Sequence, residues 1–189
     1  MEVEAYGGPE DRASHARFGS TVRNAVMAGP AGIAYVYLVY GMYDCLNVVT
    51  GSDGAASAVL IRAVEPLVGV DAMRASRLAV ADRRRAVREG AGGPEVQARL
   101  ARTPDRRLAS GPGLVGACFG VDPGWTGADL CDPASPLRLE RDTDAPDGAD
   151  PGRTIASGPR IGIGYAGEPW TSMPWRFWID GHASVSRAR

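Results

Sequence analysis

The sequence predicts an α+β fold built around an antiparallel sheet. Aromatic and β-branched residues concentrate in residues 33–40 and again in residues 45–49, with Gly41 and Met42 between the two runs, as in a β-hairpin. The nearly continuous apolar run at 58–64 follows a turn-prone stretch and predicts a third strand of the same meander. Helical segments are expected before and after this meander and further strands near the end. Regular βαβ alternation is absent, so a parallel α/β fold is excluded.

The remaining elements are predicted from apolar periodicity and from glycine and proline at their ends. The stretch from Val68 to Arg88 mixes apolar residues with arginines and predicts an amphipathic helix. Pro112 occupies the first turn of a helix that runs to about Phe119. The other predicted elements are a short helix from Glu95 to about Arg102, late strands at 137–140, 160–164 and 176–179, and a mobile acidic loop at 142–152.

The composition is that of one domain spanning residues 1–189. A chain of 189 residues with 44% hydrophobic and 23% charged residues supplies one core and little room for a second. No run approaches the roughly 18 consecutive apolar residues of a membrane span, and the first residues lack the features of a signal peptide. We therefore expect a monomeric protein of the cytoplasm with no membrane partner.

Residues able to bind a metal or a cofactor are scattered. Cys45, Cys118 and Cys131 form no Cys-x-x-Cys pair, and His15 and His182 are the only histidines. Neither a Gly-x-x-x-x-Gly-Lys loop nor a Gly-x-Gly-x-x-Gly turn after a strand and before a helix occurs. The sequence therefore predicts neither a metal site nor a cofactor. All 21 basic residues are arginines, so no lysine amine can form a Schiff base with a substrate.

Charge is unevenly distributed although the net charge is only −1. Arginines outnumber acids between Asp71 and Arg107, and acids outnumber arginines between Asp122 and Asp150. The arginine-rich segment 74–107 is either a solvated helix face or a nucleic-acid-binding patch, and the sequence leaves both readings open.

A series of motifs follows along the chain in a fixed order. They are Glu2-Val3-Glu4-Ala5-Tyr6-Gly7-Gly8-Pro9-Glu10-Asp11, His15 followed by Thr21-x-Arg23-Asn24, the tyrosine-rich run from Tyr35 to Asn47, Leu60-Ile61-Arg62-Ala63-Val64-Glu65-Pro66, Ser110-Gly111-Pro112, and Arg160-Ile161-Gly162-Ile163-Gly164-Tyr165-Ala166-Gly167-Glu168. In order and spacing these motifs resemble the alkyladenine DNA glycosylase family, the mammalian-type 3-methyladenine DNA glycosylases. The resemblance implies a single-domain mixed α/β roll with a curved antiparallel sheet, a protruding β-hairpin and surrounding helices.

The resemblance also implies a partner, which is double-stranded DNA containing damaged purines, and therefore association with the nucleoid in a prokaryotic cell. The hairpin would enter the minor groove, where Tyr40 would fill the gap left by a flipped nucleotide. The other expected DNA-binding residues are Gly41, Met42, Tyr43, Arg23 and Asn24. By position, the flipped base would lie between Tyr6 and His15 on one side and Tyr37 on the other. Asn47 would meet the purine edge, and the main chain near Ile163 would hydrogen-bond the base.

Glu4 matches the general base of the family, which takes a proton from water as the water attacks the sugar C1′. Arg62 matches the residue that orients this water and carboxylate. Glu2 shares a strand face with Glu4, so geometry alone does not choose between them, and the motif selects Glu4. The expected reaction is the hydrolytic release of alkylated or deaminated purines in base-excision repair, leaving an abasic site. It would be monofunctional, with no lyase step.

The sequence departs from the family pattern at two places. Family members usually carry additional residues before the Glu-x-Glu-Ala-Tyr motif, so we expect this chain to lack N-terminal elements of the family. The alternative function is therefore a non-catalytic module that binds damaged bases or nucleic acid, in which Glu4 is not held in place. Leu114 stands where the family commonly has a phosphate-contacting lysine, so one backbone contact would be lost.

Overall fold

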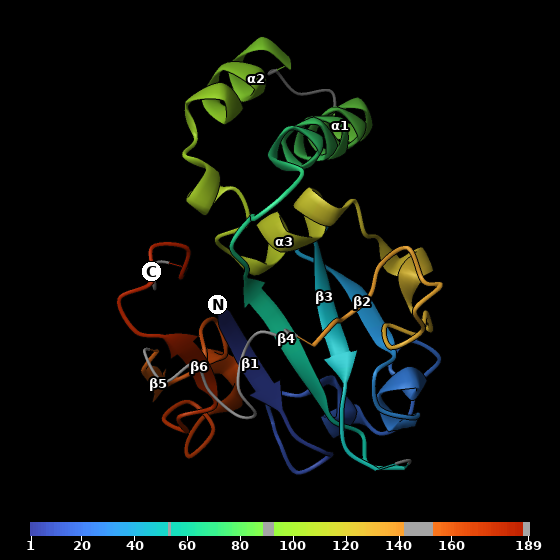
Figure 1. The fold of residues 1–189 in the computed structure, drawn as a ribbon. Helices are drawn as coiled ribbons and strands as arrows, with labels where there is room; N and C mark the ends of the chain where they lie inside the picture. Colours follow the sequence, from blue (N-terminus) through green and yellow to red (C-terminus); the bar gives the residue numbers. More distant parts are fainter. Residues whose placement is uncertain (53, 89–92, 142–152, 187–189) are drawn as a thin grey trace.

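One antiparallel sheet of six strands runs through the part of the chain that the structure describes (Figure 1). The computed structural model describes residues 1–52, 54–88, 93–141 and 153–186. The strand order is β2-β3-β4-β1-β6-β5. The strands are β1 (Glu2–Tyr6), β2 (Ala34–Val39), β3 (Tyr43–Val49), β4 (Ala58–Ala63), β5 (Ile155–Gly158) and β6 (Arg176–Ile179). The predicted α+β class, with an antiparallel sheet and a hairpin, is confirmed.

The hairpin and the third strand form the predicted meander. In the ladder between β2 and β3, Tyr35 pairs with Asn47 and Tyr37 with Cys45. Alternate residues of β2 face opposite sides of the sheet, as the period of a strand requires. Ala34 and Val36 therefore join one apolar cluster, whereas Tyr35 joins another on the opposite face, with Tyr37 packed against it.

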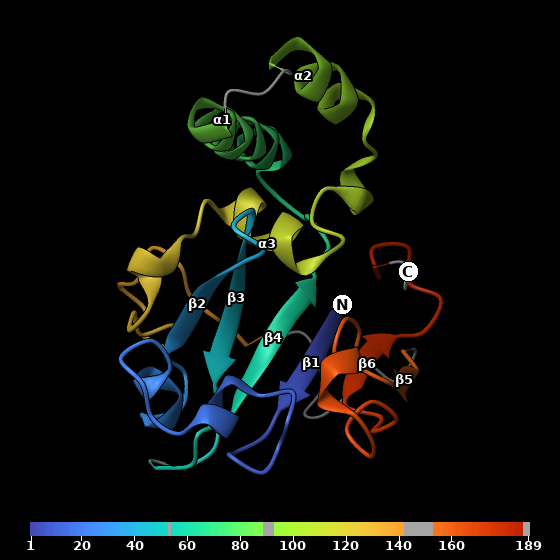
Figure 2. The same ribbon diagram turned by 180° about the vertical axis from the view of Figure 1, so that it is seen from behind.

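Three α-helices lie together at one end of the described part of the sheet (Figures 1 and 2). They are α1 (Val70–Arg88), α2 (Gly93–Arg102) and α3 (Pro112–Phe119). Helix α3 packs on β3 and β4, α1 packs on α3, and α2 packs on α1. Gly116 allows the close approach of α3 to β3, because a Cβ there would lie 2.1 Å from the carbonyl oxygen of Asp44. None of the described helices has the length and apolar character needed to cross a membrane.

Strand β1 lies inside the sheet, between β4 and β6. Its Glu4 pairs with Leu60 of β4 and with Arg176 of β6. Neighbouring strands cover both edges of β1, and the side chains of Glu2 and Glu4, which project from one face of the sheet, are buried, with 1% and 0% exposure. The sheet therefore places two carboxylates in the protein interior, where each needs hydrogen-bond donors.

Several predicted elements are wrong. Residues 137–140 and 160–164 form no strand: Leu139 makes one backbone hydrogen bond to Leu130, and Gly162 has a φ of 78°, which breaks an extended strand. Helices were expected before the meander, but the structure has strand β1 and two 3-10 turns there, η1 (His15–Phe18) and η2 (Ala25–Ala28). Strand β5 was not predicted, and the expected loop at 142–152 lies outside the described residues.

Candidate active site

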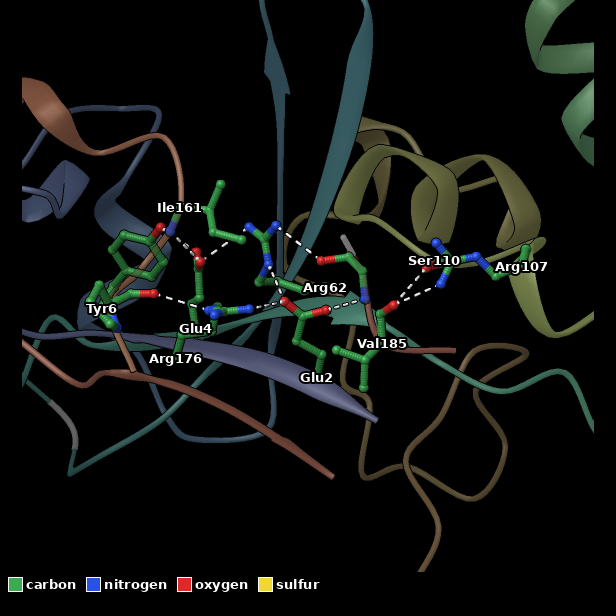
Figure 3. A network of polar contacts seen from close by, with 11 residues as sticks. Glu2, Glu4, Tyr6, Arg62, Arg107, Ser110, Ile161, Arg176 and Val185 are labelled. Atoms are coloured by element: carbon green, nitrogen blue, oxygen red, sulfur yellow. Dashed lines mark hydrogen bonds and ion pairs between the residues drawn. The ribbon is translucent and has the colours of Figure 1, made fainter. Parts of the chain in front are cut away.

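Glu4 lies at the centre of a network of hydrogen-bond donors (Figure 3). One carboxylate oxygen accepts from the backbone N–H of Ile161 at 2.8 Å and lies 3.1 Å from Nη1 of Arg62. The other oxygen accepts from the hydroxyl of Tyr6 at 2.8 Å. These donors come from three separate parts of the chain, and they fix the carboxylate in one orientation.

Arg62 bridges the two buried carboxylates of β1. Its Nε donates to Glu2 at 2.9 Å while its Nη1 lies 3.1 Å from Glu4, and the residue is only 6% exposed. Arg176 adds a second cation, 3.3 Å from Glu2. Two carboxylates and two guanidinium groups therefore balance one another in charge, which is the condition under which buried ions persist.

Glu2 and Glu4 differ in their surroundings, although they share a strand face as expected. Glu2 accepts from the backbone N–H of Ser186 at 2.6 Å, near the carboxyl-terminal end of the described chain. Burial would raise the pKa of Glu2, but hydrogen bonds from Ser186 and Arg62 outweigh burial and lower it. Glu4 instead bonds to Tyr6, which lines an aromatic cavity. The surroundings therefore distinguish the two carboxylates, because only Glu4 is bonded to a residue that lines the cavity.

The aromatic cavity has a volume of about 40 Å³. Its aromatic lining comes from β1, β2, η1 and the 3-10 turn η5 (Gly164–Ala166), and Asn47, Met27 and two alanines complete the wall. The aromatic lining residues are Tyr6, His15, Tyr35, Tyr37 and Tyr165. A space of this size holds about one water molecule, far less than a purine. The rings must therefore move apart before a base can enter. Tyr165 is 63% exposed and so has room to move.

His15 packs against Tyr37, with their ring centroids 4.5 Å apart and the rings at 73°. No ring contact joins His15 to Tyr6 in the described part of the chain. Both residues line the aromatic cavity, and their placement on one side of a base stays a prediction. Nδ1 of His15 lies 2.7 Å from the hydroxyl of Tyr35, and burial, with smaller effects of Arg23 and Arg17, lowers the pKa of His15 to about 4. The imidazole is therefore neutral at pH 7.

Lowering the pH is expected to destabilise the protein through His15. The pKa is about 4 in the folded chain against an ordinary 6.5, so the unfolded chain takes up the proton first. Stability is thus fully present above pH 6.5 and declines as the pH falls towards 4. Urea unfolding across this range should show a steeper decline for the wild type than for His15→Gln. The matched control, His182→Gln, should keep the steep decline, and equal slopes for the wild type and His15→Gln would contradict the prediction.

Asn47 lines the aromatic cavity and Ile163 does not, and the expected hydrogen bond from the main chain near Ile163 to a base stays a prediction. The amide NH₂ of Asn47 donates to the carbonyls of Tyr35 and Cys45, at 3.0 and 3.2 Å. Because both partners only accept, the amide orientation is determined, and its oxygen is left for the cavity. Ile163 instead packs in an apolar cluster with Ala13 and Ala166, against which Tyr6 also packs.

Arg160 supports the ring of Tyr6 from behind, a role that was not among the predictions from sequence. Its guanidinium carbon lies 4.7 Å from the ring centroid of Tyr6 and 4.9 Å from that of Trp175. Asp11 pairs with both Nη atoms, at 2.6 and 2.9 Å, and both residues are buried. Burial alone would raise the pKa of Asp11, but the hydrogen bonds from Arg160, Ala13 and Gly7 lower it.

The tip of the hairpin projects from the protein as expected. Tyr40 and Gly41 have φ values of 53° and 64°, which suits a tight hairpin turn. Tyr40 is 75% exposed, and Tyr43 is 39% exposed at the start of β3. A ring held in this strained backbone conformation and left in solvent has no packing role in the described structure. Met42 is half-buried beside it.

Arg23 and Asn24 occupy different environments. Arg23 is exposed, with its guanidinium 5.6 Å from the ring of Tyr37. Asn24 is 6% exposed, and its amide donates to the carbonyls of His15 and Gly19, at 2.8 and 2.9 Å. Asn24 therefore holds the loop that carries Arg23, and its expected contact with DNA stays a prediction.

Within the described ranges, no three His, Cys, Asp or Glu side chains are grouped as metal ligands would be. All three cysteines are free, with Cys45 and Cys118 buried and Cys131 exposed. The described site consists of carboxylates, guanidinium groups and aromatic rings. Its chemistry is that of positioning a water beside a carboxylate and binding a flat ring between aromatic faces.

Comparison with known proteins shows the family of this chain. A family model described as methylpurine-DNA glycosylase matches residues 1–183. A protein of Nocardia farcinica is 43% identical over 196 aligned residues, which cover 100% of this chain and 77% of the relative. A protein of Streptomyces avermitilis is 39% identical, and the alignment covers 100% of this chain and 75% of the relative. A protein of Anaeromyxobacter dehalogenans is 41% identical, and the alignment covers 99% of this chain and 70% of the relative. All three relatives carry the provisional name 3-methyladenine DNA glycosylase. The chain therefore belongs to the methylpurine-DNA glycosylase family, as its motifs predicted.

Proposed function

We propose that this chain is a DNA repair glycosylase that removes alkylated or deaminated purines from duplex DNA by hydrolysis. The damaged nucleotide is flipped out of the duplex, and Glu4 takes a proton from the water that attacks C1′ of its sugar. The products are the free base and an abasic site. The absence of lysine supports a monofunctional reaction without strand cleavage.

The observation that carries this proposal is the position of Glu4 between its donors and the aromatic cavity. Three donors hold the carboxylate, and one of them, the hydroxyl of Tyr6, belongs to a ring that lines the cavity. A base in this cavity would bring its sugar close to Glu4. A negative carboxylate there also stabilises the oxocarbenium-like transition state. The same geometry disfavours a purely binding module, because that alternative requires Glu4 to be unsupported.

The aromatic residues supply broad affinity for damaged purines. Stacking on an aromatic side chain is worth about 1–3 kcal/mol per base and tolerates many bases. An alkylated purine that carries positive charge is attracted further by the negative faces of tyrosine rings. Burial raises the pKa of both Tyr6 and Tyr37, so their hydroxyls stay protonated and neutral. Asn47, with its amide fixed by two carbonyls, acts as a rigid edge that disfavours the 2-amino group of guanine.

Removal of the Tyr40 ring is expected to weaken base flipping. Extruding a paired base costs a few kcal/mol, and an inserted ring recovers part of that cost. Tyr40→Ala should therefore lower the fraction of flipped hypoxanthine at least several-fold, measured with a fluorescent base analogue beside the lesion. Phe18→Ala provides a matched control, because Phe18 is similarly exposed, at 68%, but lies outside the hairpin. Equal flipping by wild type and Tyr40→Ala would contradict the role of the ring.

The test of the proposed function is release of a single damaged base. Purified protein is incubated with duplexes that carry hypoxanthine or an alkylated adenine, and abasic sites are then cleaved with hot alkali. Strand cleavage that appears only after alkali supports a monofunctional glycosylase. Cleavage before alkali would show a lyase step instead. Binding to an abasic-site analogue without release of any base would favour the non-catalytic module.

A further inference from the structure

A groove lined by arginines opens beside the hairpin tip. Its volume is about 650 Å³, and it lies between α1, α2, the amino-terminal end of α3 and the hairpin. We define the arginine groove by its cationic and aromatic lining residues, which are Arg77, Arg84, Arg99, Tyr40 and Tyr43. In both ribbon views α1 and α2 lie beyond α3, at the end of the sheet where β2 and β3 are joined (Figures 1 and 2).

The arginines of this groove are not balanced by acids. Arg84 pairs with Asp44 at 3.0 Å, but Arg77 and Arg99 have no carboxylate partner in the part of the chain that the structure describes. Arg77 is half-buried and donates to the carbonyl of Leu108 at 2.9 Å. Burial and the nearby charges of Arg99 and Arg74 lower its pKa. Like charges held together in a half-buried groove are costly, and an anion bound among them would offset that cost.

The groove shares two lining residues with the cavity that contains Arg62. Gly111 and Pro112 line the arginine groove, and they also line a second cavity of about 560 Å³ that contains Arg62 and Arg107. Arg107 has no carboxylate partner among the described residues, and its Nη1 donates to the carbonyls of Ala183 and Val185. Arg107, Arg77 and Arg99, which have no carboxylate partner among the described residues, thus line the two cavities that contain Arg62 and Tyr40.

We propose that the arginine groove binds the phosphodiester backbone of the DNA strand next to the point where Tyr40 enters the duplex. This inference rests on the proposed function, because Tyr40 defines where the DNA lies. Guanidinium groups match phosphate oxygens in geometry and charge. The apolar side chains of Val80, Val96 and Leu114 in the same groove suit the carbon face of deoxyribose. Those arginines of the segment 74–107 that line the groove would then contact DNA, and they would supply phosphate contacts beside Leu114.

The chain offers a matched pair of double variants. Arg77→Gln with Arg99→Gln removes one arginine from α1 and one from α2 inside the groove. Arg83→Gln with Arg102→Gln also removes one arginine from each helix, but both residues are exposed and lie outside the groove. Both double variants change the net charge equally, so long-range attraction to DNA changes equally. The single variant Arg99→Gln removes an exposed side chain without a hydrogen bond in the described structure, so it should fold normally.

The readout is the salt dependence of binding to a duplex with an uncleavable abasic-site analogue. Each lost phosphate contact reduces the slope of log Kd against log salt concentration by about 0.9. The slope should therefore fall by about 1.8 for the groove double variant and by about 0.9 for Arg99→Gln. The control double variant should keep the wild-type slope within about 0.2. Equal slopes for the two double variants would overturn the inference.

Base release is measured on the same proteins, so that the two proposals can fail separately. If the wild type releases damaged bases but the groove variants keep the wild-type salt slope, the proposed function is supported and phosphate binding by the groove is contradicted. A wild type that binds duplex with a groove-dependent slope but releases no base supports the groove and contradicts the enzyme. Failure of the wild type to bind any duplex would overturn both.

Discussion

Glu4→Gln is expected to reduce base release by a factor of about 10²–10⁴, the usual contribution of a general base. Glutamine keeps the size of the side chain but cannot take a proton from water. Single-turnover release of hypoxanthine from a duplex measures the loss directly. Binding to an abasic-site analogue should persist, because Glu4 is buried and contacts protein groups in this structure rather than presenting a surface to DNA. Retained binding also shows that the variant is folded.

Two further glutamates make this prediction specific. Glu10 belongs to the same amino-terminal motif but is exposed, so Glu10→Gln should leave base release unchanged. Glu2 is buried and shares Arg62 with Glu4, but its other oxygen faces Ser186 rather than the cavity. Glu2→Gln should therefore cause a smaller loss, through the position of Arg62. A larger loss for Glu2→Gln than for Glu4→Gln would assign the base to Glu2.

The part of the fold that sequence predicted best is the part held by local contacts. The hairpin from Ala34 to Val49 and β4 follow one another along the chain, and each strand pairs with the next. Their aromatic and β-branched residues alternate over the two faces of one sheet, so strand pattern and burial agree. Helix α3 was predicted from Pro112 to about Phe119, because proline sits in its first turn, and the structure ends it at Gly120 in the left-handed conformation.

The predictions that failed concern segments whose conformation is set by distant partners. The run Arg160-Ile161-Gly162-Ile163-Gly164 has the apolar alternation of a strand, but the side chain of Arg160 is drawn to Asp11 and the N–H of Ile161 to Glu4. A sequence pattern contains no information about such partners, which lie about 150 residues away in the chain.

The candidate site shows the same division. Glu4 and Arg62 were predicted as a pair from motifs in β1 and β4, and adjacent antiparallel strands do bring the two together at 3.1 Å. The support behind Tyr6 was missed, because it needs Arg160, Asp11 and Trp175 from three separate segments. An arginine in an otherwise apolar run was the available signal, since buried arginines require a carboxylate.

Breaking the buried pair of Arg160 and Asp11 is therefore expected to cost about 3–5 kcal/mol of the free energy of unfolding, the usual penalty when one partner of a buried ion pair is removed. Arg160→Met leaves Asp11 unpaired, and Asp11→Asn leaves Arg160 unpaired. Chemical denaturation of each variant measures the loss, which is a large fraction of the roughly 5–15 kcal/mol typical of a domain. The exposed pair of Arg138 and Glu140 provides the control: Arg138→Met should cost only about 0–1 kcal/mol.

The double variant Arg160→Met with Asp11→Asn separates charge pairing from packing. If the pair matters because an unpaired charge is buried, the double variant should be more stable than the sum of the two single losses predicts. Additive losses would mean that each side chain acts alone, Arg160 through its contacts with the rings of Tyr6 and Trp175. In either case Arg160 acts on catalysis through Tyr6 and Ile161, which both hold Glu4, so base release should fall even where the variant protein is fully folded. Unchanged release by folded Arg160→Met would show that Tyr6 and Glu4 keep their positions without it.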